Sequence, residues 1–216
     1  MANRYYSGVG SRRTPEGMLE EFKKLGTILA HAGYILRSGG APGADDYFEK
    51  GAIASGKGEA CAEIYLPWKG FNGRTSPLFK VDAAALKLAS QIHPAWERLS
   101  QAAQKLHARN CNQVLGLTLD TPADFLVCWT PDGCNSHATR TSQTGGTGSA
   151  ISLADMHKVP IFNLNNPAAT HRFQAFLDER NVPYKVPLLA MPHEQQDLFS
   201  AKPEPTARVS GHSRKP

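Results

Sequence analysis

Three glycine-rich turns constrain this chain more than any other feature of its sequence. They fall at residues 8–11, 39–43 and 145–148, each between an apolar run typical of a buried strand and a segment with helical spacing. A glycine turn that opens a helix can hold an anion, because glycine lets the backbone approach closely and the first helical N–H groups have no intrahelical partner. We therefore expect a chain of strand–turn–helix units with binding sites at the turns.

The same alternation of strand-like and helix-like segments continues along the chain. Strands are predicted at 5–11, 34–38, 63–68, 125–130 and 159–164, and helices at 15–33, 44–54, 147–157 and 168–180. This order predicts the α/β class: a Rossmann-like, doubly wound, mainly parallel sheet with helices on both faces. Right-handed crossovers would bring all three glycine turns to the carboxyl edge of the sheet. For the first helix we expect Thr14 as the N-cap and Pro15 as the first helical residue.

Residues 81–112 form an inserted helical segment in this scheme. The stretch is rich in Ala and Leu, and Pro94 is expected to divide it into two helices. The polar run 109–113 is predicted to interrupt the second helix, because it suits neither face of a core element. It is either a solvent-exposed loop or a cluster folded over the glycine turns or against a neighbouring subunit.

The predicted organisation is one domain over residues 1–187 and a flexible basic tail over 188–216, where proline and polar residues dominate. From Ala201 onward four Lys and Arg residues face one Glu, a net charge of 4 − 1 = +3 out of the formal +5. The remaining 5 − 3 = +2 leaves the folded part close to neutral. Net charge is therefore weak evidence for a nucleic-acid groove.

Several classes of protein are not favoured by the sequence. No apolar run approaches the ~18–20 residues that span a bilayer, and the N-terminus lacks the apolar core of a signal peptide. We therefore expect a cytoplasmic location and no membrane partner. The four cysteines lack CxxC spacing and have no histidine at ligand spacing, so neither a metal site nor a disulfide is expected. No cofactor is expected either.

Three motifs together resemble a known superfamily. They are Gly8–Arg12 with its following Thr-Pro, the stretch Ser38–Asp45, and Thr144–Ala150. In order and approximate spacing they look like the three signatures of the DprA/LOG (SLOG) superfamily, and the chain is most similar to its DprA/Smf-like proteins over residues 5–165. The resemblance implies a Rossmann-like fold, a homo-oligomer, and binding of nucleotides, nucleotide-derived signals or single-stranded DNA.

The departures from that superfamily bear on activity. LOG-type phosphoribohydrolases carry G-G-x-G-T-x-x-E in the last motif, and the position of their essential Glu falls here on Ser152. Serine cannot act as a carboxylate base or stabilise an oxocarbenium-like centre. The nearest acid, Asp155, lies one helical turn farther on. DprA proteins normally carry further domains, and the inserted segment is not part of the minimal fold. We therefore predict binding without catalytic residues.

The predicted ligand contacts come from the three turns and the polar run of the insertion. They are Gly8, Gly10, Ser11, Arg12, Arg13, Ser38, Gly39, Gly40, Gly43, Asp45, Arg109, Asn110, Thr144, Gly145, Gly146, Thr147, Gly148 and Ser149. The hydroxyls near the third turn would donate to an anion, and the arginines suit bidentate oxyanion contacts.

Some of these residues have a purely structural alternative. Asp45 either accepts from a ribose or base or only balances a helix dipole, and Ser38 is expected mainly to cap its turn. Residues 133–143 form either a disordered loop or a lid. Tyr65, Trp68 and Trp129 are interpreted as core or wall residues, with base stacking as the alternative.

Three functions follow as hypotheses. The first is binding of a nucleotide or nucleotide-derived signal, such as an ADP-ribose-like molecule or a cyclic nucleotide. The second is nucleotide N-glycosidase activity, with Asp45 or Asp155 in place of the missing Glu. The third is DprA-like binding of single-stranded DNA, helped by the basic tail.

Overall fold

A five-stranded, all-parallel sheet forms the centre of the computed structural model, which describes residues 3–187. The strand order is β3-β2-β1-β4-β5. The strands are β1 (Arg4–Gly8), β2 (Tyr34–Ser38), β3 (Ala62–Ile64), β4 (Phe125–Cys128) and β5 (Ile161–Asn163). The Rossmann-like α/β class is therefore confirmed. The predicted flexible tail, 188–216, lies outside the described residues.

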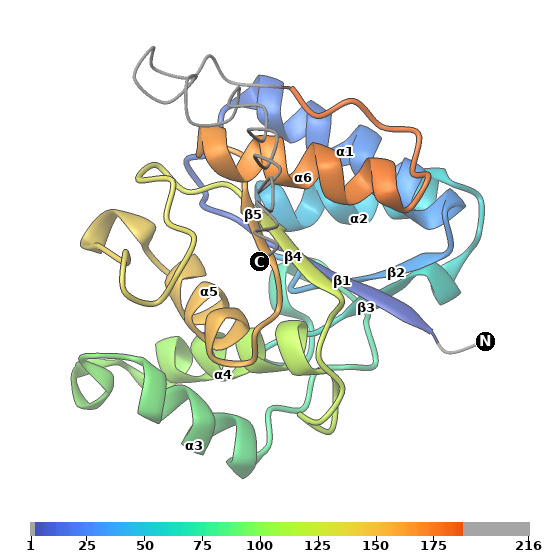
Figure 1. Ribbon diagram of the computed structural model, residues 1–216. Helices are drawn as coiled ribbons and strands as arrows, with labels where there is room; N and C mark the ends of the chain where they lie inside the picture. The colour runs from blue at the N-terminus through green and yellow to red at the C-terminus, as the bar shows by residue number, and fades with distance from the viewer. Residues whose placement is uncertain (1–2, 188–216) are drawn as a thin grey trace, which may run out of the picture.

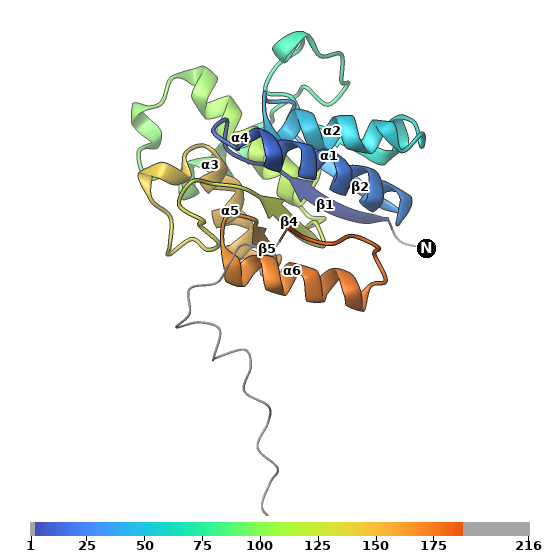
Figure 2. The same ribbon diagram turned by 90° about the horizontal axis from the view of Figure 1, so that it is seen from above.

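Six helices cover the two faces of this sheet. They are α1 (Glu16–His31), α2 (Ala44–Ala54), α3 (Ala83–Ile92), α4 (Gln101–Leu115), α5 (Thr147–Met156) and α6 (Pro167–Glu179). Helices α1, α2 and α6 pack on one face, and α3, α4 and α5 lie on the other (Figure 1). Seen from above, α1 and α2 run side by side, with α6 along the β4–β5 side (Figure 2). Short 3-10 turns occur at Glu59–Cys61, Phe71–Gly73, Trp96–Arg98 and Ser142–Thr144.

Strand β4 shows how the sheet separates two apolar cores. Phe125 and Val127 pack in the cluster under α1, α2 and α6, whereas Leu126 and Cys128 pack under α3, α4 and α5. All four side chains are fully buried. A continuous apolar strand is what a parallel sheet covered on both faces requires.

The strand order reverses beside β1. The chain first builds β2 and β3 on one side of β1 and then returns to build β4 and β5 on the other. Helices that follow β1 and β4 therefore leave the sheet in opposite directions, which opens a crevice at the carboxyl ends of these strands. Open α/β sheets bind ligands at such switch points.

Two local predictions are wrong. Thr14 does not cap the first helix: α1 begins at Glu16, extended Pro15 takes the cap position, and the Thr14 hydroxyl donates to Ser11 O (2.6 Å). The polar run 109–113 does not interrupt its helix, because α4 continues to Leu115 with all five residues of the run buried.

Strand β1 and the C-terminal end of α4 supply the polar run with partners. The Ser7 hydroxyl donates to Gln113 O (2.6 Å), and Asn112 Nδ2 donates to Gly116 O (3.1 Å). Buried polar groups that are hydrogen-bonded carry little penalty, so the helix can continue through them. No helix within residues 3–187 is long and apolar enough to cross a membrane.

Candidate ligand-binding site

A cavity of about 350 Å³ lies at the carboxyl ends of the strands. Residues from the first two glycine turns, one face of α4 and the start of α5 surround it. They are Val9, Gly10, Ser11, Arg12, Ala41, Asp45, Ala103, Leu106, His107, Arg109, Asn110, Gln113, Thr144, Gly146, Thr147 and Ala150. The volume is at the lower end of the range of small-molecule sites.

A buried ion pair joins helix α4 to helix α2 in the cavity wall. Arg109 and Asp45 are 5% and 4% exposed, and Arg109 Nη1 lies 3.2 Å from Asp45 Oδ2. The same carboxylate oxygen accepts from Ala41 N (3.3 Å). Burial raises the pKa of Asp45, and the charge of Arg109 opposes that rise. Arg109 Nε is buried without a hydrogen-bond partner in the described chain, so the guanidinium is incompletely satisfied.

Charge in the cavity favours an anion. Arg12, Asp45 and Arg109 are the charged members of its lining, so the net charge of the lining is 2 − 1 = +1. Arg12 is exposed and makes no ion pair with any residue from 3 to 187. Since Asp45 already has Arg109 as its partner, Arg12 is the cation available to a ligand. An arginine in a concave site strongly favours phosphate or carboxylate groups.

His107 is a neutral polar member of the wall. Burial, followed by the positive charges of His93, Arg109 and Arg140, lowers the pKa of His107 to about 4. A hydrogen bond joins its Nδ1 to the hydroxyl of Ser149 (2.8 Å). His107 is therefore uncharged at neutral pH and orients the first turn of α5.

The third glycine turn presents the N-terminus of α5 to the cavity. Gly146 is the N-cap, and Asn110 Nδ2 donates to its carbonyl oxygen (3.0 Å). Thr147, the first helical residue, is 7% exposed and lines the cavity. The free N–H groups and dipole of this helix add to the attraction for an anion.

Asp132 holds the segment that leads into the third turn. Its carboxylate accepts from the hydroxyls of Thr130 (2.7 Å), Thr141 (2.6 Å) and Thr144. Burial alone would raise the pKa of Asp132, but these hydrogen bonds lower it below its ordinary value. The Thr144 hydroxyl is thus engaged with protein, whereas we expected it to donate to a ligand.

The segment 133–143, expected as a disordered loop or a lid, is tied to helix α5. His137 N donates to Asp155 Oδ2 (2.8 Å). Ser152, at the position of the LOG-type Glu, is fully buried, and its hydroxyl accepts from Arg140 Nη1 (2.9 Å). Neither Ser152 nor Asp155 lines the cavity.

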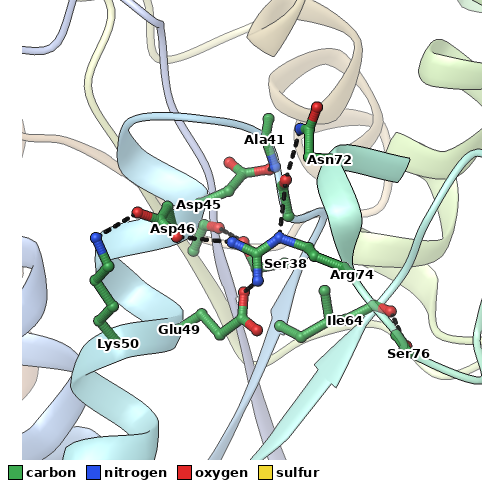
Figure 3. A network of polar contacts seen from close by, with 12 residues as sticks. Ser38, Ala41, Asp45, Asp46, Glu49, Lys50, Ile64, Asn72, Arg74 and Ser76 are labelled. Carbon is green, nitrogen blue, oxygen red and sulfur yellow. Dashed lines mark hydrogen bonds and ion pairs between the residues drawn. The ribbon is translucent and has the colours of Figure 1, made fainter. Parts of the chain in front are cut away.

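Arg74 holds the second glycine turn, a role that no motif around this residue predicts. Its Nε donates to Gly40 O (3.1 Å), its Nη2 pairs with Asp46 (2.7 Å) and its Nη1 pairs with Glu49 (Figure 3). Asn72 Nδ2 donates to the same Gly40 oxygen (3.0 Å). Gly40 has a φ of 63°, where a side chain would be strained.

Half of the predicted contacts lie around the cavity. Its lining includes Gly10, Ser11, Arg12, Asp45, Arg109, Asn110, Thr144, Gly146 and Thr147. Gly145 and Ser149 line a neighbouring, smaller cavity. The others are not in either lining: Gly8, Arg13, Ser38, Gly39, Gly40, Gly43 and Gly148.

Most residues outside the lining support the turns. A Cβ on Gly8 would lie 2.7 Å from the Phe48 ring, so this glycine serves core packing. The Ser38 hydroxyl donates to Gly8 O (2.7 Å) and joins two strands. Gly43 has a φ of 94° and shapes the second turn, and Arg13 is exposed.

Seven lining residues are outside the predicted contacts. They are Val9, Ala41, Ala103, Leu106, His107, Gln113 and Ala150. Gln113 belongs to the polar run for which a position over the glycine turns is one of the alternatives. The α4 members share a signal that was available: together with Asn110 they recur at the three- and four-residue spacing of a single helix face. Tyr65 is buried, while Trp68 is 37% exposed, and neither lines the cavity.

Comparisons with known proteins add little to this geometry. No protein-family model and no curated protein matches the chain. One similar solved structure is DNA processing protein A from Helicobacter pylori, described for its mode of binding single-stranded DNA. It is 12% identical over 82% of this chain and 81% of that one, with a TM-score of 0.36. The likeness is too loose to bear on function.

Proposed function

We propose that this protein binds a phosphate-bearing ligand the size of a mononucleotide in the 350 Å³ cavity. The observation that carries the proposal is Arg12, which pairs with no carboxylate within residues 3–187 and lines the cavity together with the buried Arg109–Asp45 pair, at the switch point of the sheet. An arginine at a cavity mouth that pairs with no carboxylate among residues 3–187 favours an anionic ligand.

The walls suggest how such a ligand would lie. Arg12 and the N-terminus of α5 at Thr147 would hold the phosphate. Val9, Leu106 and Ala150 supply an apolar surface for a base, and Asn110 and Gln113 supply amides for its edge. A cavity at the lower end of the usual range fits a mononucleotide, cyclic or open, better than the larger ADP-ribose.

Replacing Arg12 tests the proposal. In a titration calorimetry panel of AMP, GMP, CMP and UMP, we expect at least one nucleotide to bind. R12M should weaken that binding by about 10- to 100-fold, since a charged hydrogen bond contributes roughly 1.5–3 kcal/mol. R13M is the matched control, because Arg13 is exposed, adjacent and outside the cavity lining. No binding by any nucleotide, or equal losses in both variants, would contradict the proposal.

Hydrolysis of the bound nucleotide is the second candidate, because Asp45 contributes a carboxyl group to the cavity lining, and burial raises the pKa of that group. Asp155 is outside the lining, so of the two acids considered only Asp45 has access. Release of free base from the bound mononucleotide, abolished by D45N, would establish this activity.

Single-stranded DNA binding is the third hypothesis and predicts a different salt dependence. A DNA strand that neutralises several cations would bind with an affinity that falls steeply with salt. The affinity of a ligand held mainly by the single cation Arg12 would fall much less steeply with salt. Titrations of a short single strand and of the best mononucleotide at 50 and 200 mM salt distinguish the two.

A further inference from the structure

A second cavity of about 240 Å³ lies beside the first, on the other side of the third glycine turn. Its lining comprises His93, Pro94, His107, Arg140, Thr141, Ser142, Gly145, Gly146 and Ser149. His107 and Gly146 belong to both linings, so the two spaces adjoin at these residues. A ligand in the first cavity therefore lies next to the second.

The chemistry of the second cavity differs from that of the first. The first has apolar walls and contains a carboxylate, Asp45. The second has no carboxylate in its lining, only Pro94 as an apolar side chain, and Arg140 as its charged group. Its other side chains are hydroxyls and two histidines. One cation and several polar side chains, with no carboxylate to oppose them, can accommodate an anionic group.

Arg140, which lines this space, is not neutralised by a carboxylate among residues 3–187. Its Nη1 donates to the Ser152 hydroxyl (2.9 Å) and its Nη2 to Ile92 O (3.3 Å), and both acceptors are uncharged. It forms no ion pair with any residue between 3 and 187. A Cβ on Gly148 would lie 2.7 Å from Arg140 Cδ, so the arginine stem crosses the first turn of α5 closely.

We infer that the ligand carries two anionic groups, one in each cavity, on either side of Gly146. This inference rests on the proposed mononucleotide site and narrows its ligand to a nucleotide with a second phosphate. The first cavity holds the nucleoside and one phosphate beside Arg12. The second phosphate lies beside Arg140, where the Ser142 hydroxyl and backbone N–H groups of the third turn complete its hydrogen bonds.

The test compares ligands that differ by one phosphate. With the base that binds best as the 5′-monophosphate, the probes are that monophosphate, its 5′-diphosphate and its 3′,5′-bisphosphate. We expect at least one two-phosphate probe to bind the full-length protein about tenfold more tightly than the monophosphate, as one charged hydrogen bond would give. R140M should abolish that gain and leave monophosphate affinity within about twofold.

S152A provides the control for structure. It removes the hydroxyl that orients Arg140 but keeps the charge, so it should retain most of the gain, as should R140K. If R140M abolished the gain only because it loosens the 133–143 segment, S152A would reduce the affinity for the two-phosphate probes as much as R140M does. Thermal unfolding of each variant verifies that it is folded.

The possible outcomes separate the two proposals. If no nucleotide binds, the proposed function fails. If the monophosphate binds but neither two-phosphate probe gains affinity, or if the gain survives R140M, the mononucleotide site stands and the second subsite is overturned. Equal loss for all probes in R140M also overturns it, because Arg140 would then serve the first cavity or the fold.

Discussion

At the scale of single residues, Gly39 shows how the absence of one methyl group shapes the site. A Cβ at this position would lie 1.0 Å from Arg109 Nη1 and 2.7 Å from Gln113 Nε2. Its φ is not in the left-handed region, so glycine is required here for close approach and not for backbone conformation. The guanidinium can reach Asp45 only because this glycine leaves room.

Substituting Gly39 should therefore disturb Arg109. We expect G39A to lower the free energy of unfolding by about 1–3 kcal/mol through overpacking and to weaken nucleotide binding, because Arg109 must leave Asp45. Urea unfolding and calorimetry measure the two effects. G17A is the matched control: no atom lies within 4 Å of a Cβ there, and the change should stabilise helix α1 by about 0.5–1 kcal/mol. Unaltered stability in G39A would show that the pair tolerates the methyl group.

His107 predicts a pH dependence of stability. Its pKa falls from 6.5 to about 4 on folding, so between these values the unfolded chain binds a proton that the folded chain does not. Stability should therefore decrease as the pH falls through this window. Burial and Arg140 also lower the pKa of His93, which adds a contribution of the same sign.

The measurement is the melting temperature from pH 7 to pH 4. H107N should flatten the decrease relative to the unmodified protein, since asparagine keeps a hydrogen-bonding group toward Ser149 but does not titrate. H31N, at the exposed end of α1, removes a histidine away from the cavity and should retain the full slope. If the melting temperature of H107N decreased with pH as steeply as that of the unmodified protein, His107 would not be the source of the pH dependence.

At the scale of elements, the third glycine turn depends on Asp132. Three threonine hydroxyls and Cys134 N donate to one carboxylate, which joins residues 130–134 to residues 141–144. The turn before α5 is thus fixed by side chains that lie well ahead of it in sequence. Rigid positioning of this kind reduces the ordering that a ligand must otherwise impose.

D132N should loosen this element. An amide supplies one acceptor where a carboxylate supplies two, so we expect a loss of about 1–3 kcal/mol in stability and faster amide hydrogen exchange over residues 130–146. D155N is the control, since Asp155 accepts from a single backbone N–H of this segment. If amide hydrogen exchange over residues 130–146 is no faster in D132N than in the unmodified protein, the turn is fixed by other contacts.

At the scale of the whole molecule, the site exists because distant segments converge. Its lining extends from Val9 to Ala150 and draws on the ends of β1 and β2, on α4, and on the turn before α5. The reversal of strand order between β1 and β4 opens the space, and α4 closes one side of it. The inserted helical segment, which looked like an addition to a minimal fold, contributes the Arg109 side of the buried ion pair.

The sequence by itself determined the fold class, the strand and helix order, and the convergence of glycine turns at one edge. These follow from local signals: apolar runs, helical spacing, and glycine after a strand. It also identified Arg12, Asp45 and Arg109 as candidate contacts.

Only the tertiary structure decided which candidates face the cavity. The polar side chains of 109–113 look unfit for a buried helix, because the sequence shows that burying them would be costly. It does not show the hydrogen-bond partners that offset this cost. Asp45 lies far from Arg109 along the chain, and Gly146 far from Asn110. Likewise, the Thr144 hydroxyl donates to Asp132, and Arg140 donates to Ser152, because of contacts between segments apart in sequence. Hydrogen-bond partners remote in sequence set side-chain direction, and no local period encodes them.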